Sequence, residues 1–135
     1  MTPAMDQPNV RRAFAALLRW YDKNGRDLPW RKTQDAYPIL VSEVMLQQTQ
    51  VLRVLLYYES WLRLFPDWRT LSSASTASVL RAWAGLGYNR RALSLRDIAR
   101  IVIKQGEPKS EAEWDALKGI GPYTAAALTA FSLRQ

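Results

Sequence analysis

Apolar side chains recur at helical spacing along nearly the whole chain, and this periodicity limits the possible folds more than any other feature. The most regular stretch is residues 51–65, where Val51, Val54, Leu55 and Tyr58 open an i, i+3, i+4, i+7 pattern. No stretch alternates apolar and polar residues cleanly enough to indicate a β-strand. The sequence therefore predicts an all-α fold.

Proline, glycine and capping residues divide this pattern into separate helices. Thr49 and Ser75 are expected N-caps, and Ser110 with Glu113 fits the capping box S-x-x-E. There are no repeats, low-complexity stretches or internal linkers, so we expect one compact helical domain. The expected helices cover residues 10–23, a segment from 37 to before 49, and residues 51–65, 76–84, 89–105, 110–118 and 124–133.

The charge is strongly basic and unevenly distributed. The net charge is +7, and 14 of the 19 basic residues are arginines. Residues 11–105 hold most of this excess, whereas residues 106–121 carry four acids and two lysines. Arginine suits planar, bidentate contact with phosphate or a base, so a polyanion such as nucleic acid is the leading partner class. The alternative is that arginine reflects a GC-rich genome and a solvated surface, and charge does not decide between the two.

The 135 residues include no cysteine and no histidine. This excludes disulfides, cysteine-held iron-sulfur clusters, Cys/His zinc sites and histidine-based triads within these residues, so we expect no metal site. Catalysis here must rest on carboxylates, hydroxyls, lysine, arginine or amides. No apolar run approaches 18 residues and no signal peptide is evident. We expect a cytoplasmic monomer, associated with the nucleoid if the source is a bacterium, with no membrane partner.

The segment LKGIGPYTA places two glycines, Gly119 and Gly121, between two helices. Such a turn offers unpaired backbone N–H groups at a helix N-terminus, and a phosphate can approach closely because neither glycine has a side chain. The segment resembles a helix-hairpin-helix, which clamps the DNA backbone without reading sequence. Taken alone, it also fits a glycine-terminated helix with Pro122 opening the next one.

Three further motifs give this segment its context: DLPWR at 27–31, SEVMLQQTQV at 42–51 and AGLGYNRRA at 84–92. With them the chain resembles the helix-hairpin-helix superfamily of DNA glycosylases, and most closely the MutY-type adenine glycosylases, over residues 20–133. The resemblance implies a six-helix-barrel domain over residues 26–135, with the hairpin at 111–132. It also implies that the helix within residues 1–25 packs with a C-terminal cluster that this chain lacks.

By this resemblance Glu43 is the catalytic acid/base. Adenine leaves its sugar when N7 is protonated while an oxocarbenium-like sugar forms, and a carboxyl with a raised pKa suits that task. Considered alone, Glu43 would be an ordinary exposed helix glutamate. The resemblance makes Tyr123 a second catalytic position. Bifunctional relatives similar to endonuclease III carry a Schiff-base lysine there, which implies a monofunctional enzyme.

The same resemblance assigns the residues that contact DNA bases. Gln48, Leu86 and Tyr88 are implied to enter the duplex, with Gln48 as the wedge and Tyr88 stacking near the opposing 8-oxoguanine. The alternative for Tyr88 is a core aromatic, which its flanking glycines disfavour. The positions that match the adenine pocket are Arg26, Leu28, Trp30 and Arg31. Trp30 could equally fill a core, and Tyr123 could pack against the next helix, which is compatible with its proposed role.

In the family, the aspartate that stabilises the oxocarbenium ion, four cluster cysteines and an 8-oxoguanine-reading domain all follow the segment that ends here at Gln135. We therefore expect an incomplete, N-terminal portion of an adenine glycosylase that is inactive by itself. A [4Fe-4S] cluster is expected only if an extension with four cysteines exists. The implied function is removal of adenine mispaired with guanine or 8-oxoguanine in double-stranded DNA. The alternatives are a thymine or uracil mismatch glycosylase and a catalytically silent DNA-binding remnant.

Overall fold

The computed structural model describes residues 28–31 and 33–132, and the chain forms two compact units, Met1–Thr33 and Gln34–Gln135. In the first, Pro29–Arg31 forms a short 3-10 helix, η3. The helix expected over residues 10–23 lies outside the described residues.

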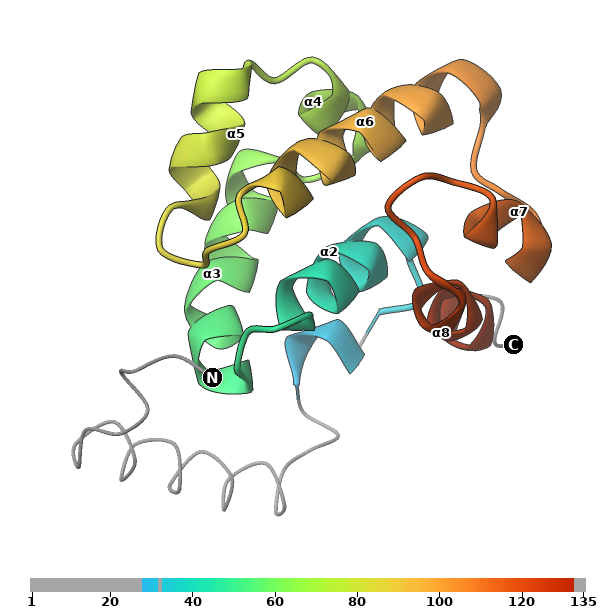
Figure 1. The fold of residues 1–135 in the computed structure, drawn as a ribbon, viewed down its shortest axis with the longest axis horizontal. Helices are drawn as coiled ribbons and strands as arrows, with labels where there is room; N and C mark the ends of the chain where they lie inside the picture. The colour runs from blue at the N-terminus through green and yellow to red at the C-terminus, as the bar shows by residue number, and fades with distance from the viewer. Residues whose placement is uncertain (1–27, 32, 133–135) are drawn as a thin grey trace. The chain divides into compact units, whose positions relative to one another are not determined.

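The second unit is all-α across its described residues, as the hydrophobic periodicity predicted, and Figure 1 shows its helices in order. None of the described helices is long and apolar enough to cross a membrane. The helices are α2 (Ala36–Leu46), α3 (Val51–Leu64), α4 (Trp68–Ser72), α5 (Thr76–Trp83), α6 (Arg90–Gln105), α7 (Glu111–Asp115) and α8 (Pro122–Ser132).

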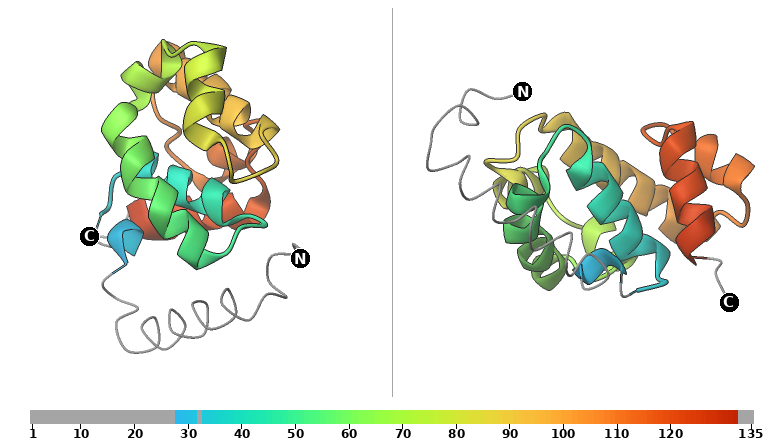
Figure 2. Two further views of the ribbon diagram at one scale, coloured as in Figure 1. Left: turned by 90° about the vertical axis from the view of Figure 1, so that its left-hand side faces the viewer. Right: turned by 90° about the horizontal axis from the view of Figure 1, so that it is seen from below.

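Helix α2 is the centre of this unit. It contacts α3, α6 and α8, and the views in Figures 1 and 2 show these helices around it. Eight of its eleven residues are buried, so it is apolar around most of its circumference, as expected of a core helix. Glu43 is its sole charged residue.

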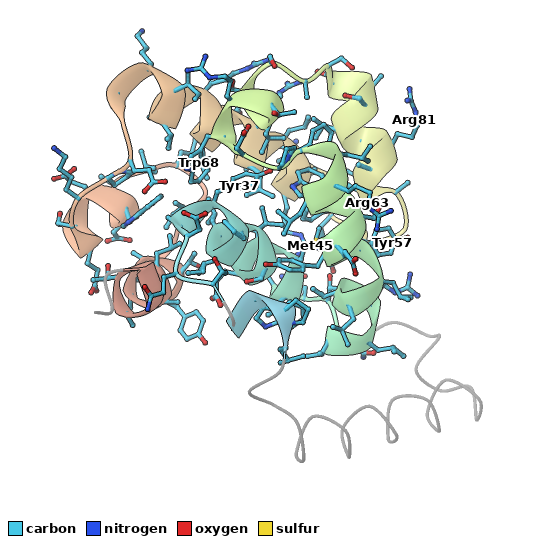
Figure 3. The ribbon with its side chains drawn as sticks, turned by 180° about the vertical axis from the view of Figure 1, so that it is seen from behind. Tyr37, Met45, Tyr57, Arg63, Trp68 and Arg81 are labelled. Atoms are coloured by element: carbon cyan, nitrogen blue, oxygen red, sulfur yellow. The ribbon has the colours of Figure 1, made fainter. Side chains whose placement is uncertain are left out.

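Aromatic side chains fill the core on the α3 and α4 side of α2. The Tyr37 hydroxyl donates a hydrogen bond to the Phe65 carbonyl at 2.6 Å and accepts one from Trp61 Nε1 at 3.2 Å. The Tyr37 ring meets Trp68 edge-on at 4.9 Å, and Figure 3 shows these two side chains together. The polar atoms of these buried side chains thus have hydrogen-bond partners, while their rings fill the core.

Two of the three expected N-caps are confirmed and one is wrong. Ser75 and Ser110 accept hydrogen bonds from the backbone N–H groups of the third residue that follows each of them. Helix α3, however, has Gln50 and not Thr49 at its N-cap position, and the Gln50 side chain makes no capping hydrogen bond. The Thr49 hydroxyl instead accepts a hydrogen bond from Arg91. It therefore makes a tertiary contact and does not cap the helix.

Helix boundaries differ from the expectations at three places. Helix α4 was not expected, and it forms because Asp67 caps it by accepting from the Thr70 N–H at 2.8 Å. Helix α7 ends at Asp115, earlier than the expected residue 118. Helix α8 begins at Pro122, two residues early, because the fixed φ of proline suits the first helical position.

Candidate functional site

Glu43 lies one helical turn before the C-terminal end of α2 and is half-buried. Burial raises the pKa of its carboxyl above the ordinary value. Among the residues that the structure describes, none donates a hydrogen bond or forms an ion pair with this carboxyl. The arrangement favours the protonated form, which is what a general acid requires.

The end of α2 is joined to the start of α8. Gln47, one turn after Glu43 and on the same face, donates a hydrogen bond from Nε2 to the buried Thr124 hydroxyl at 3.3 Å. Tyr123 precedes Thr124 and is 80% exposed. The predicted catalytic positions Glu43 and Tyr123 therefore flank one interhelical contact, on two helices that pack against each other.

The turn between α7 and α8 contains both predicted DNA-backbone glycines. Gly119 has φ +97°, a backbone conformation that residues with a side chain rarely adopt, so this turn favours glycine there. A Cβ at Gly121 would meet nothing within 4 Å. Both glycines are exposed, which leaves the first turn of α8 open to an anion.

A second loop, residues 84–88, carries the GLGY motif between α5 and α6. Arg53 donates a hydrogen bond to the Gly85 carbonyl at 2.8 Å, and Trp83 Nε1 donates one to the Gly87 carbonyl at 2.9 Å. Gly85 is also packed so tightly against Tyr57 that a Cβ there would overlap the phenol oxygen. Helix α3 therefore holds this loop closely.

The three predicted intercalating residues differ in exposure. Tyr88 is 64% exposed at the tip of the 84–88 loop, and Gln48 is exposed just after α2. Both have positive φ, at +50° and +58° respectively, a conformation rare for residues other than glycine. Leu86 is buried, so in this structure only Gln48 and Tyr88 face solvent. The intercalating roles stay predictions.

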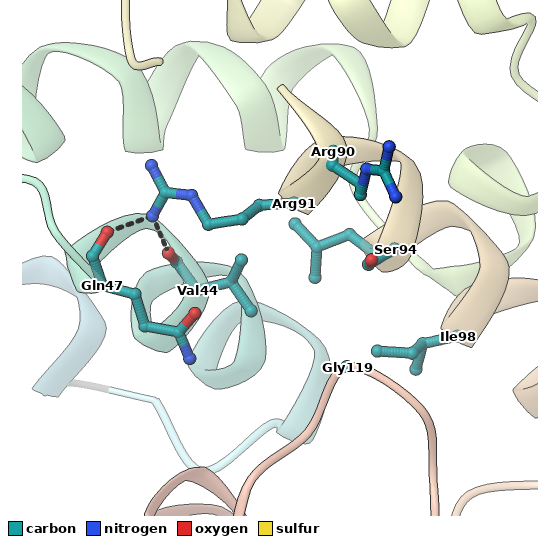
Figure 4. A pocket seen from close by; sticks show the side chains of 8 residues that line it. Val44, Gln47, Arg90, Arg91, Ser94, Ile98 and Gly119 are labelled. Atoms are coloured by element: carbon teal, nitrogen blue, oxygen red, sulfur yellow. Dashed lines mark hydrogen bonds between the residues drawn. The ribbon is translucent and has the colours of Figure 1, made fainter. Parts of the chain in front are cut away.

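Arg91 connects these two loops, and the motif-based assignments gave it no role. Its guanidinium donates to the carbonyls of Val44 at 2.6 Å and of Gln47, to the Thr49 hydroxyl at 3.0 Å and to the Gly87 carbonyl at 3.3 Å. Figure 4 shows it over the end of α2. The one sequence signal, a cation in the first turn of α6 where the helix dipole favours acids, is shared by Arg90 and Arg91 and does not distinguish them.

A cavity of about 200 Å³ lies beneath Arg91, between α2, α6 and the α7–α8 turn (Figure 4). Glu43 does not line it, so it is separate from the predicted acid. The lining residues are Val44, Gln47, Arg90, Arg91, Ser94, Leu95, Ile98 and Gly119.

The predicted base-pocket residues belong to the unit formed by residues 1–33. Arg26 lies outside the described residues. Leu28 precedes the short helix η3, which contains Trp30 and Arg31. Their assignment to an adenine pocket stays a prediction.

No metal or cluster site is formed by the described residues. Within residues 28–31 and 33–132, no group of three or more His, Cys, Asp or Glu side chains could hold a metal ion. Because the whole chain contains no cysteine, its residues cannot supply the thiolates of an iron-sulfur cluster.

Comparison with known sequences identifies the family. Residues 41–131, which include the C-terminal half of α2 with Glu43, the 84–88 loop and the α7–α8 turn, match the HhH-GPD superfamily of base excision DNA repair proteins. The chain belongs to this superfamily. Glu43 and the hairpin glycines thus lie within the segment that defines HhH-GPD proteins.

Curated relatives within this superfamily are adenine DNA glycosylases. The chain is 42% identical to the Homo sapiens protein over 142 residues, covering 96% of this chain and 26% of that protein. It is 44% identical to the Mycobacterium tuberculosis protein over 123 residues, covering 88% of this chain and 40% of that protein. The chain therefore spans about a quarter to two fifths of these relatives.

A solved structure of the superfamily also matches. A thermostable thymine-DNA glycosylase superposes with a TM-score of 0.75 at 26% sequence identity, covering 91% of this chain and 58% of that one. The match confirms that the all-α arrangement is a DNA glycosylase fold.

Proposed function

We propose that this chain is the N-terminal portion of a monofunctional adenine DNA glycosylase, which removes adenine mispaired with guanine or 8-oxoguanine from double-stranded DNA. The observation that carries the proposal is Glu43, the sole charge on the otherwise apolar central helix α2, with a carboxyl pKa raised by burial. The more than 40% identity to adenine DNA glycosylases supports adenine as the target.

In the proposed reaction the protonated Glu43 carboxyl donates to N7 of an extruded adenine. Protonation makes the base a better leaving group as the N-glycosidic bond breaks and positive charge develops on the sugar. Water then adds to the sugar carbon and loses a proton, which the Glu43 carboxylate accepts. A carboxyl in apolar surroundings keeps its proton to higher pH than an exposed one, so burial within α2 is useful for this step.

The remaining proposed roles are divided among the loops. Gln48 and Tyr88 face solvent from neighbouring loops and would fill the gap left by the extruded base. Gly119 and Gly121 would bind the phosphate backbone through N–H groups at the start of α8. Tyr123 cannot form a Schiff base, which supports a monofunctional enzyme. Leu28 and its neighbours in the 26–31 segment would contribute to the adenine pocket.

The proposal extends to partner and setting. Residues 26–135 would act as the DNA-binding barrel domain and residues 1–25 would pack with a further helical cluster. The partner would be duplex DNA containing a mismatched or oxidised base pair, bound by a monomer in the cytoplasm or the nucleoid.

A thymine mismatch glycosylase is the second candidate, because the matched solved structure is named as acting on thymine. Its 26% identity, against more than 40% for the adenine glycosylases, ranks it lower.

A single-turnover assay of a full-length version of the protein separates the two. The substrates are duplexes with adenine opposite 8-oxoguanine, adenine opposite guanine, thymine opposite guanine and uracil opposite guanine. We expect base release only from the two adenine duplexes. The 135-residue chain alone should release little or none. Release of thymine or uracil without adenine would contradict the proposed target, and release of no base at all would favour a silent DNA-binding protein.

A further inference from the structure

We propose that Arg91 is a positioning residue that locks the two DNA-facing loops, residues 47–50 and 84–88, into one unit. The inference rests on the proposed function only for what the loops do on DNA. Each loop carries one solvent-facing residue predicted to enter the duplex, Gln48 and Tyr88, and Arg91 hydrogen-bonds to both loops.

The first half of the lock is the C-terminal end of α2. The last carbonyls of a helix lack intrahelical partners and carry partial negative charge. Helix α2 has no basic residue in its last turn, so it supplies no cation of its own. Arg91 supplies that cation from α6, donating to the carbonyls of Val44 and Gln47 and to the Thr49 hydroxyl.

The second half is the 84–88 loop. Arg91 donates to the Gly87 carbonyl at 3.3 Å, and its guanidinium carbon lies 5.2 Å from the Trp83 ring and 5.6 Å from the Tyr88 ring. Contact at these distances is attractive because the ring faces carry negative charge. The same side chain thus contacts the residue whose stacking the proposed function requires.

Backbone conformation provides the reason for a lock. Gln48 and Tyr88 are the two non-glycine residues with positive φ in the described part of the chain, and each lies in one of the two loops. Such strained conformations persist only where several surrounding contacts stabilise them. Arg91 donates to Gln47 and Thr49 on either side of Gln48, and to Gly87 immediately before Tyr88.

The chemistry of this contact is specific to arginine. Acceptors from the end of α2 and from both loops surround one planar guanidinium, whose donors are fixed in a fork. No carboxylate pairs with it among the described residues, and its Nε is buried without a hydrogen-bond partner. A lysine keeps the charge but is a single compact donor group, so it cannot bridge both loops at once.

The first test measures the lock without DNA, by amide hydrogen exchange on the 135-residue chain. We expect Arg91→Lys to speed exchange at residues 47–50 and 84–88 together, by about tenfold or more. The matched control is Arg96→Lys. Arg96 lies on the same helix and is buried, but it donates to the Ala74 carbonyl before α5 and to the hydroxyl of Thr76, the first residue of α5. This control should speed amide exchange around residues 74–76 and leave exchange in both loops unchanged.

A milder variant covers the case in which Arg91→Lys does not fold. Thr49→Val removes one acceptor of Arg91 while keeping the side-chain shape. Because Arg91 couples the loops, exchange should rise at residues 84–88 as well as at 47–50. Unchanged exchange in both loops of Arg91→Lys, or a response in only the mutated loop of Thr49→Val, would overturn the lock.

The second test uses duplex DNA with 2-aminopurine beside the mismatch, whose fluorescence rises when the base unstacks. At saturating protein we expect a rise with the wild-type chain and with Arg96→Lys, and a rise at least threefold smaller with Arg91→Lys. An equal rise with Arg91→Lys would overturn the positioning role. No rise with the wild-type chain would instead refute insertion by these loops, and with it that part of the proposed function, while hydrogen exchange still decides whether the lock exists.

Discussion

The carboxylate of Glu43 is energetically unfavourable in a helix that is otherwise almost entirely apolar. A carboxylate surrounded by apolar groups loses hydration, and within the described residues no cation compensates it. An apolar or amide side chain could fill a structural role at this position with a smaller desolvation free energy. The energetic cost at this residue is therefore an argument for function.

This cost predicts how stability depends on pH. Burial raises the pKa of Glu43 above 4.5, so the folded chain binds this proton more tightly than the unfolded chain. Stability contributed by the neutral form is full below pH 4.5 and falls as pH rises through the raised pKa. We expect Glu43→Gln to raise the free energy of unfolding at neutral pH, with the difference shrinking toward zero in acid. Urea denaturation at about pH 7 and about pH 4 measures it.

Glu59→Gln is the matched control for this prediction. Glu59 lies on α3, its side chain is 83% exposed, and its ion pair with Arg63 is 3.7 Å long. Exposed pairs contribute little, so this variant should unfold much like wild type at both pH values. A Glu43→Gln chain that is less stable than wild type at neutral pH would show that the carboxylate has a stabilising partner.

At the residue scale, the sequence predicted roles through motifs and missed roles that depend on tertiary contacts. Glu43 is predicted as the acid because its motif is long and specific, and this role stays a prediction. Arg91 looks equivalent to Arg90 in the sequence, and only the fold shows that its guanidinium reaches α2. Leu86 was grouped with Tyr88 by its motif, but its side chain points into the protein.

At the scale of elements, the positions of the helices followed from the apolar periodicity and from the proline, glycine and capping residues between them. The exact helix ends depended on local contacts. Val51 begins α3 and Gln105 ends α6, close to expectation, because apolar spacing and Gly106 mark them. Helix α4 has only five residues, too few for a period to be visible, and its cap at Asp67 was the available signal. Thr49 failed as a cap because Arg91 competes for its hydroxyl.

The α7–α8 turn gives a prediction at this scale, in which its two glycines behave differently. Gly119→Ala should destabilise the chain by about 1–3 kcal/mol, because its φ of +97° is strained for any residue with a side chain. Gly121→Ala should leave stability nearly unchanged, since open space surrounds its Cβ. Both should weaken duplex binding, because a methyl group obstructs close approach of phosphate. Urea unfolding and a DNA titration measure the two effects.

Gly121→Ala is the decisive variant of this pair, because its effect on DNA is free of a folding defect. If it binds duplex as tightly as wild type, the turn is a helix connection and not a backbone clamp.

For the whole molecule, the net charge of +7 predicts the character of DNA binding. The 135-residue chain should bind duplex with little sequence preference, and log K should fall linearly with log salt concentration as counterions are released. Titrations at two salt concentrations measure the slope. An affinity that does not change with salt would remove the electrostatic basis of the proposed interface.

The sequence was least informative about how distant segments combine. The apolar periodicity predicted the fold class and the motifs predicted the family, and both are confirmed, whereas the roles of the candidate residues stay predictions. The periodicity and the motifs could not show that the GLGY loop and the end of α2 share one arginine, because that contact joins residues 44 and 91. The base-pocket segment belongs to a different unit from α2, and no local pattern relates the two.

The most direct test of the central claim is adenine release by Glu43→Gln in a full-length version of the protein, measured in single turnover on adenine opposite 8-oxoguanine. Glutamine is nearly isosteric but cannot supply the proton, so we expect release to fall by roughly 10² to 10⁴-fold. Binding to the same duplex should be retained or tightened, because a negative charge near phosphates is removed. Release at the wild-type rate would contradict the assignment of Glu43 as the acid, and loss of both release and binding would identify it as a structural residue.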